Sequence, residues 1–350
     1  MSNNTNNTNN TSVLNEVPEG LRIVVIFLSV FIMIMGIFGN ALVCILVYQN
    51  RKMRTAMNFF LVNLAISDGL ICLFNIPVTL IYNEFKFWPF GKILCKTLPA
   101  LSQVLLAAAA GSLVAVSWER FKWIVLTFNE KMSLNQAKMI IIIIWLIGLL
   151  NGLPVFGAMR LQFAGFSSCS EVYPAMIYKQ VYTVVSFVLF YLLPVLFITP
   201  LYIMMIMKLR QKTDTSVQLS KVDLKRRKAA LKMLLVVVVT YAVCLLPNYI
   251  LFILLDFKHV NVTSSFMITL NITTLLLWAN SMINPIIYCA QSGDYARGFI
   301  RIICCGSLRS RLMLRIRRTR GQSFGSCDQT TGASQYERVQ QGASSSNSSC

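Results

Sequence analysis

The chain has 350 residues, of which 56% are hydrophobic and 13% are charged, and its formal net charge is +19. This composition excludes an ordinary soluble domain, because the hydrophobic residues gather in several stretches of about twenty or more. It also argues against a nucleic-acid-binding protein, because the basic residues are divided among segments that flank those stretches. We predict an all-α membrane protein with no nucleic-acid partner.

Seven hydrophobic stretches are each long enough to cross a membrane as a helix. At about 1.5 Å per residue, about twenty helical residues span a hydrocarbon core about 30 Å thick. The stretches are 21–48, 58–82, 95–123, 137–157, 176–207, 231–255 and 266–290. Their hydrophobic residues do not alternate with polar ones, which argues against a membrane β-barrel. The sequence therefore predicts a seven-transmembrane helix bundle over residues 21–292.

The basic residues predict the orientation of the bundle. Only seven of the 32 Lys and Arg residues fall at one set of helix ends: Arg22, Lys86, Lys92, Lys96, Arg160, Lys179 and Lys258. The positive-inside rule places the side with more basic residues in the cytoplasm. We therefore expect an extracellular N terminus, a cytoplasmic C terminus and an attraction to anionic lipid of the inner leaflet.

Residues 1–20 are expected to form a disordered extracellular tail. Sequons for N-linked glycosylation occur at Asn3, Asn6, Asn9 and Asn10. A polar low-complexity segment without sugars is the alternative. No pattern of a cleaved signal peptide precedes the first span, so we expect that span to serve as the signal anchor.

Two of the ten cysteines are expected to form a disulfide bond. The other eight lie within predicted spans or on the predicted cytoplasmic side, where thiols stay reduced. Only Cys95 and Cys169 face the oxidising side. Their bond would join the loop after the fourth span to the outer end of the third span, and two free thiols are the alternative.

Polar residues inside the spans are costly in lipid and are therefore candidates for function. Asp68 lies within the second span and needs a partner. Asn40 in the first span, and Asn280, Ser281 and Asn284 in the seventh, lie at compatible depths. We expect these five residues to hold a hydrated sodium ion, and we expect no other metal and no cofactor.

After the seventh span, the segment SGDYARGFIRIICC predicts a short amphipathic eighth helix over residues 293–305. Cys304 and Cys305 beside the membrane are palmitoylation candidates, with free thiols as the alternative. Residues 306–350 are rich in Ser, Thr, Gly and Arg, and we expect a disordered cytoplasmic tail there. Its serine clusters are candidate sites for kinases and arrestin.

Seven short motifs occur in order along the spans. They are GN at Gly39–Asn40, LAISD ending at Asp68, ERF at Glu119–Phe121, Trp145, Pro194 with Tyr202, CLLP ending at Pro247, and NPIIY at Asn284–Tyr288. Over residues 21–305 the chain thus resembles a rhodopsin-like (class A) G-protein-coupled receptor. The resemblance implies a plasma-membrane receptor, not an enzyme, that binds an extracellular ligand and activates heterotrimeric G proteins. Receptor kinases and arrestin would be further partners.

The resemblance also implies which residues change their contacts on activation. Glu119 would hold Arg120 in the inactive state, and the arginine would be released toward the G protein on activation. The other residues implied in this rearrangement are Tyr202, Pro247, Asn284, Pro285 and Tyr288. Phe128, in the loop after the third span, would insert into the G protein.

The sequence departs from the family pattern at several positions of this switch. Many relatives have an acid at the start of the sixth span that forms a second salt bridge with the arginine, and Arg227 stands there instead. We therefore expect measurable signalling without agonist. In the same span Leu245 replaces a tryptophan and Tyr241 a phenylalanine. In the third span Ala110 replaces a larger aliphatic residue, and Ala109 replaces a serine that would complete the sodium site.

Two classes of ligand are disfavoured by this resemblance. Retinal would need a lysine in the seventh span, and Trp278 stands at about that position. Amine receptors of the family have an aspartate in the outer half of the third span. This chain has Ser102 and Gln103 there.

The remaining features favour a peptide ligand. The segment FWPFGKILC resembles the Trp-x-Phe-Gly loop of peptide receptors, and residues 160–173 predict a hairpin over an open pocket. Asp256 lies where neuropeptide Y-like and RFamide-like receptors bind an arginine of the ligand, and Glu171 is a second outer acid. The residues expected to line the pocket are Ser102, Gln103, Asn248, Tyr249, Phe252 and Trp278.

Two other functions remain open from the sequence. A class A receptor for a small lipid or nucleoside would have the same switch, and peptide-evoked signalling distinguishes it from a peptide receptor. A membrane transporter or channel is the second alternative. Such proteins often contain internal repeats, and we find none. No His, Cys and Asp constellation with catalytic spacing supports an enzyme.

Overall fold

The computed structural model describes residues 18–126, 132–210, 221–258 and 263–303. Contacts divide the chain into two units, 1–302 and 303–350, and only Ile303 of the second unit is described. Several predicted sites lie outside the described residues and stay predictions: Asn3, Asn6, Asn9, Asn10, Phe128, Cys304 and Cys305.

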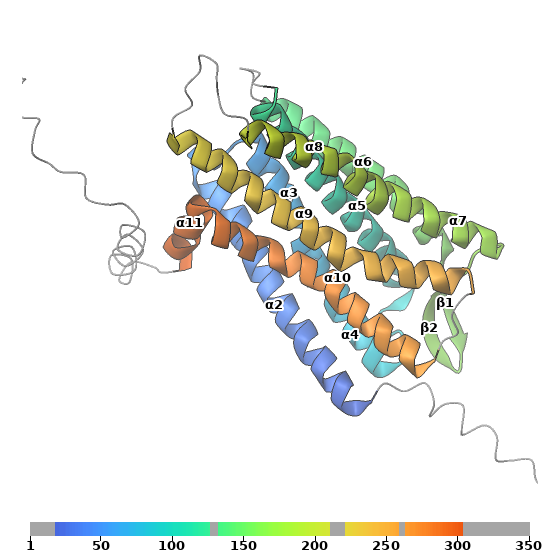
Figure 1. The fold of residues 1–350 in the computed structure, drawn as a ribbon. Helices are drawn as coiled ribbons and strands as arrows, with labels where there is room; N and C mark the ends of the chain where they lie inside the picture. The colour runs from blue at the N-terminus through green and yellow to red at the C-terminus, as the bar shows by residue number, and fades with distance from the viewer. Residues whose placement is uncertain (1–17, 127–131, 211–220, 259–262, 304–350) are drawn as a thin grey trace, which may run out of the picture. The chain divides into compact units, whose positions relative to one another are not determined.

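Among the described residues, seven helical spans are long and hydrophobic enough to cross a membrane, which confirms the predicted class of fold (Figure 1). They are α2 (Glu19–Gln49), α3–α4 (Ala56–Phe85), α5 (Gly91–Ile124), α6 (Leu134–Ala158), α7–α8 (Met176–Arg210), α9 (Lys221–Asp256) and α10 (Ser264–Gln291). The helices extend beyond the predicted stretches, because polar residues continue the helix past its hydrophobic part. The clearest case is α9, which begins at Lys221 rather than at Leu231.

Two of the spans are interrupted by a π-helical turn. Ile71–Asn75 separates α3 (Ala56–Leu70) from α4 (Ile76–Phe85). Val188–Leu192 separates α7 (Met176–Phe187) from α8 (Leu193–Arg210). Such turns widen the helix by one residue and often occur at functional sites.

Side-chain caps fix where several helices begin. Ser133 and Gln136 form a capping box at α6: the Gln136 backbone N–H donates to Ser133 Oγ at 3.2 Å, and the Ser133 N–H donates to Gln136 Oε1 at 3.0 Å. Thr263 accepts a hydrogen bond from the Phe266 N–H at 3.2 Å and caps α10. These caps satisfy backbone donors that have no partner within the helix.

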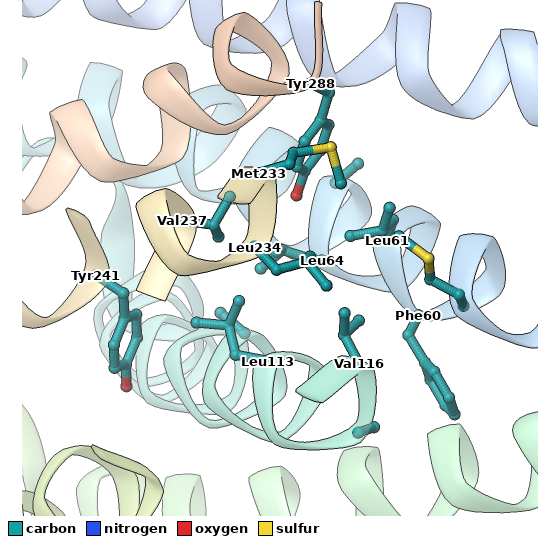
Figure 2. Close-up of a cluster of buried hydrophobic side chains, with 14 of the residues drawn as sticks. Phe60, Leu61, Leu64, Leu113, Val116, Met233, Leu234, Val237, Tyr241 and Tyr288 are labelled. Atoms are coloured by element: carbon teal, nitrogen blue, oxygen red, sulfur yellow. The ribbon is translucent and has the colours of Figure 1, made fainter. Parts of the chain in front are cut away.

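The most buried span is α5, which contacts α3, α6, α8 and α9. Figure 2 shows part of the resulting core, where side chains from α3, α5 and α9 meet. Leu64, Val116 and Leu234 are almost completely buried in it. In contrast, α6 leaves large side chains such as Leu150 exposed on its outer face, as expected for a helix beside lipid.

The predicted hairpin is present between α6 and α7. Strands β1 (Met159–Ala164) and β2 (Phe166–Glu171) pair antiparallel, with Leu161 opposite Cys169. Gly165 makes the turn with a φ of +80°, which suits glycine. The predicted disulfide bond between Cys95 and Cys169 is confirmed and anchors β2 to the start of α5. We call this side of the bundle the hairpin end.

The helix α11 (Gly293–Ile303) occupies the place of the expected eighth helix, at the end of the bundle opposite the hairpin (Figure 1). Its Tyr295 and Phe299 are buried, and the Tyr295 hydroxyl donates to Asn58 Oδ1 at 3.3 Å. Arg120 lies near the same end, close to the C terminus of α5. We call this side the Arg120 end.

Two glycines let α5 and α6 approach closely. A Cβ added at Gly148 would lie 3.0 Å from the Val104 carbonyl oxygen, and one added at Gly152 would lie 2.9 Å from that of Ala100. In lipid, helices associate by close packing rather than by a hydrophobic driving force, so small residues are favoured at their contacts. The contact between α5 and α6 therefore depends on these two positions.

We predict that Gly152→Ala destabilises the protein and that Gly157→Ala does not. Both changes add a methyl group to α6 and raise its helix propensity equally. Outside the local helix backbone and chain neighbours, however, no atom of the described residues lies within 4 Å of a Cβ at Gly157. Overpacking costs about 1–3 kcal/mol, so the apparent melting temperature of the purified Gly152→Ala protein should fall by several degrees. Equal melting temperatures for the two variants would contradict this account of the helix contact.

Candidate functional site

The polar residues predicted to meet inside the bundle lie together in the structure. Asn284 Nδ2 donates to Asp68 Oδ2 at 2.8 Å, which joins α10 to α3. Asn40 Nδ2 donates to the carbonyl oxygens of Gly36 and Ser281, each at 2.9 Å, which joins α2 to α10. All of these polar side chains are buried. Each hydrogen bond therefore forms away from water, where leaving it unmade would be costly.

Four buried oxygens of this polar cluster have no hydrogen-bond partner among the described residues. They are Asn40 Oδ1, Asp68 Oδ1, Asn280 Oδ1 and Asn284 Oδ1. Carboxylate and carbonyl oxygens are the ligands that hard cations prefer, so the donor set fits a sodium ion. Ala109 adds no oxygen from α5, and Ser112 Oγ is already bonded to the Ala108 carbonyl at 2.7 Å. The sodium site stays a prediction.

At the Arg120 end, Glu119 and Arg120 form the expected pair. Their Oε2 and Nε atoms are 3.5 Å apart, and both side chains are largely buried. Tyr202 and Tyr288 are also buried, and neither hydroxyl has a hydrogen-bond partner within the described part of the chain. A cluster of buried polar groups that are only partly satisfied is suited to exchange its partners.

In place of a salt bridge from an acid on the sixth span, the structure has contacts between arginines and an aromatic ring. The guanidinium carbon of Arg227 lies 4.4 Å from the centre of the Trp123 ring. The guanidinium carbon of Arg120 lies 5.2 Å from the same ring. A cation over an indole face is attracted by the ring quadrupole. The sequence analysis missed Trp123, although its spacing of three residues from Arg120 places both on one face of a helix.

The fifth and sixth spans are joined by two tyrosines. Tyr241 of α9 donates from its hydroxyl to the carbonyl oxygen of Phe190, in the π-helical turn. Tyr191 of the same turn donates to the carbonyl oxygen of Ala242 at 2.9 Å. Tyr241 therefore does more than replace a phenylalanine, because its hydroxyl ties the two spans. Leu245 is buried beside these residues in the core.

A cavity of about 600 Å³ lies between α2, the second span, α9 and α10 at the hairpin end. Asn248, Phe252 and Trp278 line it, as the sequence predicted. Its other polar lining residues are Arg22, Asn75, Thr79, Asn83, Glu84, Lys86, Asn271 and Thr274. The sequence analysis missed Asn75, Thr79, Asn271 and Thr274, which are polar residues inside otherwise hydrophobic spans.

The other predicted ligand-binding residues do not line this cavity. Tyr249 packs against Phe187 and Tyr191, with ring centres 5.5 and 5.7 Å apart. Ser102 donates to the carbonyl oxygen of Leu98 at 2.9 Å, and Gln103 is half-buried on the same helix. Their predicted role in binding therefore has no support from this cavity.

Asp256 is buried and already paired, rather than exposed at the outer surface. It is 1% exposed, and its Oδ1 lies 2.9 Å from Lys179 Nζ. Thr183 Oγ1 donates to its Oδ2 at 2.6 Å, and Gln180 Nε2 donates to its backbone oxygen at 3.0 Å. These contacts anchor α7 to the end of α9.

Glu171 completes this charged group at the hairpin end. Its Oε2 lies 3.8 Å from Lys179 Nζ, so the lysine faces two carboxylates. Partial burial raises the pKa of Glu171, Lys179 opposes that rise, and Asp256 adds to it. Acidification should therefore neutralise Glu171 at a higher pH than an ordinary glutamate.

Comparison with known proteins agrees with these features. The family described as "7 transmembrane receptor (rhodopsin family)" matches residues 39–288. Neuropeptide FF receptor 1 of Rattus norvegicus is 32% identical over 292 residues, which cover 77% of this chain and 68% of that protein. A QRFP-like peptide receptor of Branchiostoma floridae is 27% identical over 303 residues, 83% and 80% of the two chains. Neuromedin-U receptor 2 of Homo sapiens is 29% identical over 301 residues, 81% and 72%.

The match extends across all the motifs from Gly39 to Tyr288. It agrees with the seven spans, the disulfide bond and the Glu119–Arg120 pair in the structure. The relatives are receptors rather than enzymes. The chain belongs to the rhodopsin family of seven-transmembrane receptors.

Proposed function

We propose that the protein is a plasma-membrane receptor that binds a short peptide at its hairpin end and activates heterotrimeric G proteins at its Arg120 end. The observation that supports a peptide most directly is the cavity of about 600 Å³ with many neutral polar groups. Its size falls in the range of ligand sites, and carboxamides and hydroxyls match the donors and acceptors of peptide bonds. The relatives named for neuropeptide FF, QRFP-like peptides and neuromedin U support the same class of ligand.

The distribution of charge in the cavity favours an amidated C terminus. The charged lining residues Arg22, Glu84 and Lys86 come from the ends of helices, and Arg22 Nε donates to Glu84 Oε2 at 2.9 Å. Asn248, Asn271 and Thr274 are neutral and lie further along their helices. A free carboxylate among neutral groups would lose its water without gaining a cation. A carboxamide would lose less hydration free energy on burial and could still form hydrogen bonds with these groups.

We predict that amidated peptides added to the medium evoke calcium or cyclic-nucleotide responses in transfected cells. In Asn248→Ala cells the response should need roughly 10- to 100-fold more peptide, because one buried hydrogen bond is lost. Ile250→Ala is the matched control, since Ile250 lies two residues away on α9, is 45% exposed and does not line the cavity.

Equal potency in the two variants would place the ligand outside this cavity. A lack of response to every amidated peptide added to the medium would argue against the proposed peptide ligand. The outward orientation of the hairpin end rests on the distribution of the basic residues and is tested separately by the accessibility of an N-terminal tag on intact cells.

Asp256 can take part in peptide binding only if its present partner is displaced. We propose that an arginine of the peptide replaces Lys179 beside Asp256, because a guanidinium can pair with both oxygens of a carboxylate. The buried carboxylate would then stay paired throughout, as a buried charge must.

Lys179→Met tests this exchange by removing the competing ammonium. We predict that the potency of an arginine-containing peptide rises about tenfold or more and that the potency of its citrulline analogue changes little. Asp256→Asn should lower the potency of the arginine peptide only. If each variant changes the potency of the arginine peptide and of the citrulline peptide to the same extent, Asp256 and Lys179 anchor α7 to α9 without binding the ligand.

On the opposite side, we propose that the contact between Arg227 and Trp123 restrains α9 in the inactive state. It joins the sixth span to the third, as the missing salt bridge would. A cation–π contact contributes about 0.5–2 kcal/mol, less than a well-formed buried ion pair. G-protein binding would separate α9 from α5 and release Arg120 from Glu119. The absence of an acid therefore leads to a weaker restraint rather than to none.

Trp123→Leu should raise signalling without agonist. Loss of about 0.5–2 kcal/mol shifts the ratio of active to inactive receptor by roughly 2- to 30-fold. The measurement is agonist-free second-messenger level, normalised to receptor at the cell surface. Trp118→Leu is the control, because Trp118 lies on the same helix and stacks on Phe121 rather than on an arginine. An equal rise in both variants would rule out a specific role of the cation–π contact.

A further inference from the structure

A second large cavity lies at the hairpin end and shares no lining residue with the peptide cavity. Its volume is about 680 Å³, and it is lined by the end of α6, the start of β1, the segment after β2 and one face of α7. Tyr178, Val181, Tyr182 and Val185 line it from α7. Their spacing of three and four residues places them on a single helical face.

Two hydrogen bonds join α7 to α6 at Asn151. The Tyr182 hydroxyl donates to the backbone oxygen of Asn151 at 3.2 Å, and Ser186 Oγ donates to Asn151 Oδ1 at 3.1 Å. Closer to the hairpin, α6 has Pro154 and Gly157. Among the described residues, and leaving aside its own helix backbone and chain neighbours, a Cβ placed at Gly157 would have no atom within 4 Å. The lining residues from α6 are Pro154, Gly157 and Ala158, which have small or compact side chains.

The wall of the cavity is hydrophobic and faces outward from the bundle. Val181 and Val185 lie in α7, and Val172 directly follows β2. These valines are 53, 45 and 43% exposed, respectively. Hydrocarbon chains of lipid are the molecules that meet such a surface in a membrane. The wall therefore matches an acyl chain.

The rim of the cavity has a cation with no carboxylate beside it. Arg160, the second residue of β1, lines the cavity and is exposed. Its Nη1 donates to the carbonyl oxygens of Gly157 and Met159, which hold the guanidinium near the end of α6. No carboxylate lies within ion-pair distance of Arg160 in the part of the chain that the structure describes.

Tyrosines also line this cavity. Tyr173 is one of them, although its hydroxyl is itself buried. Tyr178 is exposed and also lines it. Tyrosine and arginine together at the boundary between a hydrophobic wall and a polar loop match the boundary between acyl chains and head groups of a bilayer.

We propose that this cavity binds one phospholipid of the membrane, with its phosphate at Arg160 and an acyl chain along Val172, Val181 and Val185. A guanidinium forms paired hydrogen bonds with phosphate oxygens, which a neutral lipid cannot offer. The site is separate from the peptide cavity and does not depend on the proposed peptide ligand.

Native mass spectrometry of the full-length protein in detergent tests the proposal with two added lipids. They are dioleoyl phosphatidylglycerol and dioleoylglycerol, which have the same acyl chains with and without a phosphate. We expect one retained phosphatidylglycerol per protein, with about tenfold preference over dioleoylglycerol. Val181→Trp should place a bulky ring across the acyl-chain wall of the cavity and displace that bound lipid. Ile177→Trp is the matched control, because Ile177 is 57% exposed on α7 and does not line the cavity.

Arg160→Gln separates the two parts of the proposed site. The preference for phosphatidylglycerol should fall to about the level of dioleoylglycerol, while binding of dioleoylglycerol itself stays unchanged. Equal lipid retention by Val181→Trp and Ile177→Trp would overturn the site. An undiminished phosphate preference in Arg160→Gln would overturn the role of the cation. Neither measurement uses a peptide, so failure here leaves the proposed receptor function untouched.

Discussion

Lipid offers no hydrogen-bond partner to a side chain, so a polar group inside this bundle has to be satisfied by another part of the chain. The pairing of Asp68 with Asn284, and of Asn40 with the Ser281 carbonyl, joins the first and second spans to the seventh span, which is distant from them in sequence. A second group of hydrogen bonds joins the second, third and fourth spans. There, Trp145 Nε1 donates to Asn63 Oδ1 at 2.8 Å, and Asn63 Nδ2 donates to Ser112 Oγ at 2.8 Å.

The groups that escape this pairing gather where a receptor has to change shape. The hydroxyls of Tyr202 and Tyr288 and the free oxygens around Asp68 are buried without partners among the described residues. A buried polar group is costly to leave without a partner, so these groups are suited to bind an ion or water, or to change partners when helices move.

The two ends of the bundle use charge in different ways. At the hairpin end, Lys179 lies between the carboxylates of Asp256 and Glu171, so the acids already have a cation. At the Arg120 end, two guanidinium groups lie over one indole ring, and Glu119 is the carboxylate paired with Arg120. Under the proposed function, a ligand at the first end would have to compete with an ion pair, whereas a G protein at the second would have to separate a weaker aromatic contact.

The sequence by itself determined the features that depend on local pattern. Hydrophobic length gave the seven spans, alternating short segments around Cys169 gave the hairpin, and the separation of oxidising from reducing sides gave the disulfide bond. It also located Asn40, Asp68 and Asn284 at similar depths. These properties are set by neighbours along the chain and by the thickness of a membrane.

Only the tertiary structure decided which partners the charged side chains at the ends of the sixth span contact. The sequence predicted that Asp256 binds an arginine of the ligand, whereas in the structure a cation on another helix, Lys179, already pairs with it. At Arg227 the sequence predicted the loss of a salt bridge to Arg120, because no acid stands there. In the structure Arg227 contacts the Trp123 ring instead. The two cavities likewise depend on where helices diverge. Pairing between helices reflects their packing angles and separations, and no local pattern of residues encodes those.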